Sequence, residues 1–231
     1  MPKYEHVFFD LDRTLWDFDT NSKVALGEIY LEFKLKERGI DSSNAFIEIY
    51  QAINEELWDQ YRKGLLNKRK LRALRFSRTL EHFGFSDEYL GEQLGTAYIE
   101  ISPYKTAVLP NCIEILDYLA GRYQLHIITN GFEEVQNIKL DQSGLTKYFS
   151  KIITSEQACA RKPDPKVFNY AFGLTKGSVK NSLMIGDDLR TDIEGARNIQ
   201  MDHVYFNPRR VVHSEELFHE IGDLLELKNL L

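Results

Sequence analysis

Two aspartates one residue apart follow a short apolar segment near the beginning of the chain. Val7, Phe8 and Phe9 favour β structure, and Asp10 and Asp12 come directly after them. The run predicts a buried strand, and in a continuing extended chain both carboxylates would point the same way. Two adjacent carboxylates need a counter-charge, which a divalent cation such as Mg²⁺ supplies through oxygen ligands. A carboxylate in such a place can also act as a nucleophile.

Three further polar segments stand at positions from which they could approach Asp10 and Asp12 in the folded chain. Thr129-Asn130 and Gly186-Asp187-Asp188 each follow an apolar segment that predicts a strand, and Asp192 stands four residues further on. Lys162 precedes Pro163 in a loop before a predicted helix. Ligands of parallel α/β sheets bind beyond the carboxyl ends of the strands, so we expect these segments to converge there.

The alternative is that these polar residues have unrelated structural roles at strand ends and helix caps. In this interpretation Asp187, Asp188 and Asp192 cap the following helix, and Lys162 is a solvated loop lysine. The joint occurrence of all the segments favours the catalytic interpretation.

The pattern of elements predicts an α/β fold. From residue 109 onward, apolar strands alternate with helices, which is typical of a Rossmann-like parallel sheet with helices on both faces. Residues 17–108 instead carry four helical segments joined by short loops, predicting an inserted four-helix-bundle cap. We therefore expect a catalytic core at 1–16 and 109–231 and a cap at 17–108. We also expect the tail from Ser214 to be helical, and the basic run from Lys68 to Arg75 to be a solvated helix face.

Composition restricts the function. The chain has 231 residues and a net charge of −6, which argues against binding to a nucleic-acid polymer. Its two cysteines, Cys112 and Cys159, form no metal-binding pattern. Neither a signal peptide nor a membrane-spanning segment is evident, so we expect a cytoplasmic protein, and we take it to be a monomer.

In their order, these motifs resemble those of haloacid dehalogenase superfamily phosphatases. The four motifs are Asp10-Leu11-Asp12-Arg13-Thr14, Thr129, Lys162-Pro163 and Gly186-Asp187-Asp188, the last with Asp192 following. Arg13 departs from the glycine often seen at its position. The segments Ile128-Thr129-Asn130-Gly131-Phe132 and Lys162-Pro163-Asp164-Pro165, with Gln136 between them, are similar to bacterial pyrimidine 5'-nucleotidases.

The resemblance implies a role for each motif residue. Asp10 would be the nucleophile and Asp12 the general acid and base. Mg²⁺ would be held by the Asp10 carboxylate, the Asp12 backbone carbonyl and the Asp187 carboxylate. The Thr129 hydroxyl, the Asn130 amide and Lys162 would hold the phosphoryl oxygens, and Asp188 or Asp192 would give outer support.

The implied function is a Mg²⁺-dependent phosphomonoesterase that forms an aspartyl-phosphate and acts on small phosphorylated substrates. Nucleoside 5'-monophosphates, with pyrimidines preferred, are the expected substrates. A phosphatase of sugar phosphates or phosphoglycolate, a sugar phosphomutase on the same core, and a binding module without catalysis are the alternatives. Because the lysine loop must turn sharply, we also expect a cis Lys162-Pro163 bond.

Overall fold

A computed structural model gives the structure of the protein and describes residues 3–231. The chain divides into two compact units. One contains the described residues up to Phe18 together with Thr106–Leu231, and the other contains Asp19–Lys105. None of the helices in the described range is long and apolar enough to cross a membrane.

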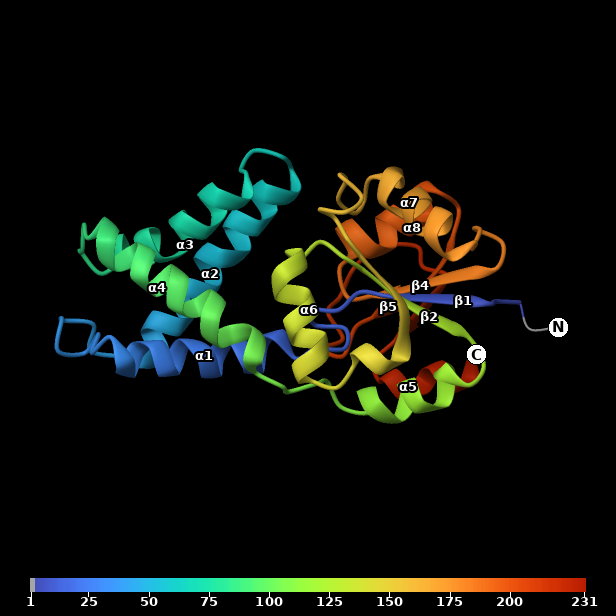
Figure 1. Cartoon of the computed structure of the whole chain (residues 1–231), viewed down its shortest axis with the longest axis horizontal. Coiled ribbons are helices and arrows are strands. Elements are labelled where there is room, and N and C mark those ends of the chain that lie inside the picture. The colour runs from blue at the N-terminus through green and yellow to red at the C-terminus, as the bar shows by residue number, and fades with distance from the viewer. Residues whose placement is uncertain (1–2) are drawn as a thin grey trace. The chain divides into compact units, whose positions relative to one another are not determined.

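A parallel sheet forms the centre of the first unit (Figure 1). The strand order is β3-β2-β1-β4-β5-β6, with parallel pairing throughout. The strands are β1 (His6–Phe9), β2 (Gln124–Thr129), β3 (Phe149–Thr154), β4 (Ser182–Gly186), β5 (Asp202–Phe206) and β6 (His219–Ile221). In register, Phe9 lies beside Ile127 of β2 and Ile185 of β4. The strand ends that carry the polar motifs are therefore neighbours, and the expected α/β fold is confirmed.

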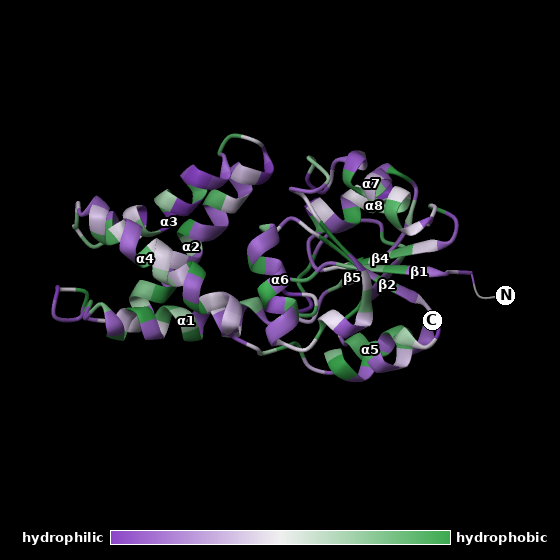
Figure 2. Ribbon diagram, in the orientation of Figure 1, coloured by the Kyte–Doolittle hydropathy of each residue, from purple (hydrophilic) through white to green (hydrophobic). Residues whose placement is uncertain are grey.

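Helices cover both faces of this sheet because its strands are apolar on both sides. Val7 and Phe9 belong to one buried cluster with residues of α5 (Cys112–Ala120) and α6 (Glu133–Gln142). Phe8 belongs to another, with residues of α7 (Pro165–Thr175) and α8 (Glu194–Asn198). The middle of the unit is correspondingly coloured as hydrophobic in Figure 2.

The C-terminal segment differs from the helix expected from Ser214 onward. It contains β6, which pairs with β5 at the sheet edge, and then a 3₁₀ helix at Leu224–Asn229. Ile221 and Leu224 are buried, so this segment extends the core. The 3₁₀ helix begins with a capping box between Asp223 and Glu226.

The second unit is helical, with α1 (Phe18–Glu32) beginning one residue before it. The other helices are α2 (Ser43–Arg62), α3 (Lys68–His82) and α4 (Glu88–Ile101). Ser42, Asn67 and Asp87 cap the last three by accepting a backbone N–H bond. α3 packs against both α2 and α4, and Phe76 lies in their shared core.

One part of the basic run on α3 does not lie on a solvated face. Lys70 is exposed, but Arg75 is only 5% exposed. Arg75 follows Leu71 by one helical turn and shares the face that carries Phe76 and Leu80 into the core. The expectation of a solvated basic face is therefore wrong for Arg75.

Candidate active site

Lys162 lies at the centre of the polar cluster beyond the strand ends. Its Nζ lies 2.5 Å from Asp10 Oδ1 and 2.6 Å from Asp192 Oδ1, and it donates to the Ile128 carbonyl oxygen at 2.6 Å. Lys162 is 1% exposed, so these groups, rather than water, stabilise its charge. The bond between Lys162 and Pro163 is cis, as expected.

Three carboxylates lie close together here, and two of them contact the Lys162 ammonium group. Oxygen atoms of Asp10, Asp187 and Asp192 all lie within 4.8 Å of one another. Burial raises the pKa of Asp10 to about 7, against the opposing effect of the Lys162 charge. Burial and repulsion from Asp10 and Asp192 raise the pKa of Asp187 well above its ordinary value. Burial also raises the pKa of Asp192. Asp10 and Asp192 are buried and Asp187 is partly buried. One lysine does not balance three such carboxylates, so the donor set suits a hard divalent cation.

The loop after β4 brings Asp192 into this cluster. A side chain on Gly186 would collide with the Asp192 carboxylate, so the chain can approach only at a glycine. The Asp188 backbone N–H donates to Asp192 Oδ2 at 3.1 Å. Asp188 itself caps the π-helical turn Leu189–Ile193, accepting from the Arg190 N–H at 2.8 Å. The side chain of Asp188 thus supports the helix start, while that of Asp192 lies within the acidic group.

Thr129 and Asn130 end β2 beside Lys162. The Thr129 hydroxyl accepts from Gly131 N–H at 3.0 Å and from Gln136 Nε2 at 2.8 Å, leaving its hydrogen to donate. The Asn130 side chain donates to the Lys162 carbonyl at 3.0 Å and accepts from the Lys162 N–H at 2.9 Å. The Asn130 side chain therefore fixes the backbone of the lysine loop.

Asp12 contacts a different set of partners from Asp10. Its carboxylate accepts from Lys139 Nζ at 2.6 Å and from Gln136 Nε2 at 2.9 Å. The extended conformation does not continue past the strand, because the Leu11 carbonyl accepts from the Leu15 and Trp16 N–H groups in a tight turn. The condition for both aspartates to point the same way is therefore not met. Arg13 takes a φ of 63° in this turn, a left-handed conformation that explains a preference for glycine there.

Three residues that contact the site aspartates were assigned no role from the sequence. Thr14 donates to Asp187 Oδ1 at 3.2 Å, and Gln136 and Lys139 hold Asp12. A signal for the last two was present in the sequence: they stand one helical turn apart, and Gln136 shares a helix face with the apolar Leu140 four residues later. Polar residues on the apolar face of a helix are candidates for a buried contact.

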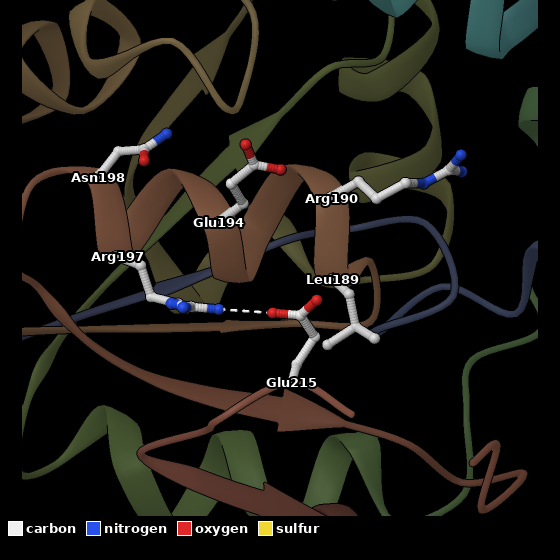
Figure 3. A pocket seen from close by; sticks show the side chains of 6 residues that line it. All are labelled: Leu189, Arg190, Glu194, Arg197, Asn198 and Glu215. Atoms are coloured by element: carbon white, nitrogen blue, oxygen red, sulfur yellow. Dashed lines mark hydrogen bonds and ion pairs between the residues drawn. The ribbon is translucent and has the colours of Figure 1, made fainter. Parts of the chain in front are cut away.

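A separate hollow lies beside α8 and does not include the acidic cluster (Figure 3). Its volume is about 480 Å³, and it is lined by Leu189, Arg190, Glu194, Arg197, Asn198 and Glu215. The Arg197–Glu215 ion pair, 2.7 Å long, crosses it as Figure 3 shows. Both side chains of the pair are more than two-fifths exposed, so it contributes little and marks no reactive group.

Known proteins are similar to this chain over almost its whole length. The family model for haloacid dehalogenase-like hydrolases matches residues 7–206. The pyrimidine 5'-nucleotidase PynA of Streptococcus pneumoniae is 35% identical, with 90% of this chain and 86% of that protein covered. The pyrimidine 5'-nucleotidase YjjG of Escherichia coli is 30% identical, with 99% and 98% covered.

A solved structure matches as well. The magnesium-bound putative hydrolase YfnB of Bacillus subtilis superposes with a TM-score of 0.88 at 27% identity, covering 99% of both chains.

Proposed function

The chain belongs to the haloacid dehalogenase-like hydrolases, and we propose that it is a Mg²⁺-dependent phosphatase of nucleoside 5'-monophosphates that prefers pyrimidine bases. The observation that carries the proposal is the cluster of Asp10, Asp187 and Asp192, in which Asp10 and Asp192 pair with the buried Lys162. An array of one ammonium and one metal suits phosphoryl transfer, which depends mainly on positioning and on charge stabilisation. The similarity to the two pyrimidine nucleotidases supports the substrate class.

In the first half-reaction, an Asp10 oxygen attacks the phosphorus while the bond to the nucleoside 5'-oxygen breaks. The Asp12 carboxyl gives its proton to that leaving oxygen, so the nucleoside departs neutral. The product on the protein is an aspartyl-phosphate. Lys162, the Thr129 hydroxyl and the Asn130 main-chain amide hold the phosphoryl oxygens, since the side chain of Asn130 is engaged with the lysine loop.

In the second half-reaction, the Asp12 carboxylate takes a proton from water as the water oxygen attacks the phosphorus. The bond to Asp10 breaks, which restores its carboxylate and releases inorganic phosphate. The same residue acts as acid and then as base, so each cycle returns it to its starting state.

The residues around Asp10 fit a magnesium ion. Asp10 and Asp187 would hold it through their carboxylates, together with the Asp12 backbone carbonyl, while Asp192 and Asp188 support the loop. Bound there, Mg²⁺ supplies positive charge that offsets the clustered carboxylates and the negative charge of the phosphoryl group. Thr14 orients Asp187 by donating to its Oδ1.

We predict that purified protein with Mg²⁺ releases phosphate from pyrimidine nucleoside 5'-monophosphates faster than from sugar phosphates or phosphoglycolate. Chelation with EDTA should abolish the release, and Asp10→Asn should lower kcat by at least about 10³-fold because the nucleophile is lost.

Assays of the same set of phosphate esters also distinguish the nucleotidase from the alternative functions. Cleavage of sugar phosphates with nucleotides untouched would refute the substrate class. A rearranged phosphate ester without net phosphate release would point to a mutase. Activity that persists in Asp10→Asn would refute the covalent mechanism.

A further inference from the structure

Two polar residues of α6 are buried where the helix faces the candidate site. Gln136 is 1% exposed and Lys139 is 4% exposed. Burying a lysine costs free energy unless its charge is paired and its hydrogen bonds are made. A lysine kept in such a place needs a specific partner.

That partner is Asp12. Lys139 Nζ lies 2.6 Å from Oδ1 of Asp12, and Gln136 Nε2 lies 2.9 Å from Oδ2. Each carboxylate oxygen therefore has its own donor, so both oxygens of Asp12 are held. Charge-assisted bonds of this length are among the stronger side-chain contacts.

The aromatic residues around Lys139 restrict where its ammonium group can lie. Nζ lies 4.2 Å from the ring centre of Trp16 and 5.6 Å from that of Phe18. Trp16 is fully buried and forms a β-bridge with Asp12, so the ring is fixed to the same loop as the carboxylate. A cation over an aromatic face is attracted to it, which favours one position of the lysine.

Gln136 connects Asp12 to the phosphate-binding side of the site. Its amide nitrogen donates one hydrogen to Asp12 and the other to the Thr129 hydroxyl at 2.8 Å. A side chain on Gly131 would collide with this amide, so the loop after β2 leaves room for it only at a glycine. The position of Gln136 thus depends on the glycine in the loop after β2 as well as on α6.

We propose that Lys139 and Gln136 are positioning residues for Asp12, orienting its carboxyl group toward the leaving oxygen during phosphoryl transfer. This inference rests on the proposed function, because it assigns these two residues to its acid step. Lys139 acts through Asp12 alone, whereas Gln136 also orients the Thr129 hydroxyl. A misplaced acid matters most when the leaving oxygen is a poor leaving group, as in a nucleotide, and least for p-nitrophenyl phosphate.

The test compares kcat/KM for the two kinds of ester. In Lys139→Met, kcat/KM for an alkyl phosphate should fall about 10- to 100-fold more than that for p-nitrophenyl phosphate. Lys139→Arg should recover part of the difference because it restores a cation. The alkyl phosphate is whichever ester the wild type cleaves best, so the test holds even if nucleotides prove not to be substrates.

A double-mutant cycle then shows whether Lys139 acts through Asp12. Adding Lys139→Met to Asp12→Asn should cause no further loss in kcat/KM for the alkyl phosphate. Gln136→Met should show the same dependence on the leaving group and should also raise KM for both esters, because it frees Thr129. The matched control is Lys228→Met, since Lys228 makes a 2.7 Å ion pair with Glu114 at the surface.

Two outcomes would overturn the inference. One is an equal loss for both esters in Lys139→Met, which is the mark of a purely structural role. The other is a full further loss in the Asp12→Asn background. If Asp12→Asn itself leaves kcat/KM for alkyl phosphates unchanged, the proposed mechanism fails instead, so the two failures are distinguishable. Thermal unfolding of every variant checks that it is folded.

Discussion

Asp192 can join the acidic group because residue 186 has no side chain. The Asp192 carboxylate occupies the space that a Cβ on Gly186 would need. Asp192 also pairs with Lys162 and accepts from the Asp188 N–H. A single missing methyl group thus allows the loop after β4 to bring a third carboxylate to the ammonium group.

We therefore predict that Gly186→Ala moves Asp192 out of the cluster. The unfolding free energy should fall by about 1–3 kcal/mol, because the added methyl overpacks a buried site. Denaturant unfolding of the variant measures this loss. Gly173→Ala is the matched control, since a Cβ there meets nothing within 4 Å. Within α7 that change should raise the unfolding free energy by up to about 1 kcal/mol. Equal stability of the two variants would contradict the argument.

At the scale of elements, α3 carries a charge into the core of the helical unit. The Arg75 guanidinium lies 5.2 Å from the Tyr98 ring centre. Among the described residues, Arg75 Nε is buried without a hydrogen-bond partner. Taking a charged guanidinium out of water costs free energy.

Replacing Arg75 by methionine should therefore stabilise the protein. We expect Arg75→Met to raise the unfolding free energy by about 1–3 kcal/mol, because an apolar chain of similar length removes the cost of burying the guanidinium. Denaturant unfolding followed by circular dichroism measures the change. The exposed Arg69→Met on the same helix should change stability by less than about 0.5 kcal/mol. A large loss in Arg75→Met would show that Arg75 stabilises the bundle.

At the scale of the whole molecule, a histidine pair makes the stability of the fold depend on pH. His6 Nδ1 and His126 Nε2 lie 3.1 Å apart inside the sheet, and both residues are buried. Burial, assisted by the charges of His6 and Lys151, lowers the pKa of His126 to about 4. Burial also lowers the pKa of His6.

The sign of the effect follows from proton binding. The unfolded chain, in which histidine titrates near pH 6.5, takes up this proton before the folded protein does. The contribution of His126 is therefore present above about pH 6.5 and is lost as the pH falls toward 4. The loss amounts to about 3 kcal/mol at the low end, at 1.36 kcal/mol per pKa unit.

Comparison with His126→Leu isolates this contribution. The unfolding free energy of the wild type, relative to the variant, should decline between pH 6.5 and 4.5. The exposed His82→Gln provides the control and should follow the wild type. Parallel curves for wild type and His126→Leu would show that His126 is not held neutral.

The sequence by itself determined the order of the elements as far as β5, the α/β fold and the family. These features are local or repetitive: apolar runs predict strands, capping residues mark helix starts, and the motifs follow one another in a fixed order. The approximate ends of β2 and β4 were predictable in the same way, which is why the polar segments after them could be named as a candidate site.

Only the tertiary structure decided which side chains meet. Lys139 and Asp12 are separated by 127 positions, and Thr14 and Asp187 by 173, so no local pattern pairs them. The burial of Arg75 depends on which face of α3 meets its neighbours, and β6 forms only because an edge of the sheet is available to a short segment. Local sequence patterns specify elements, whereas contacts between distant residues form only once the elements have packed.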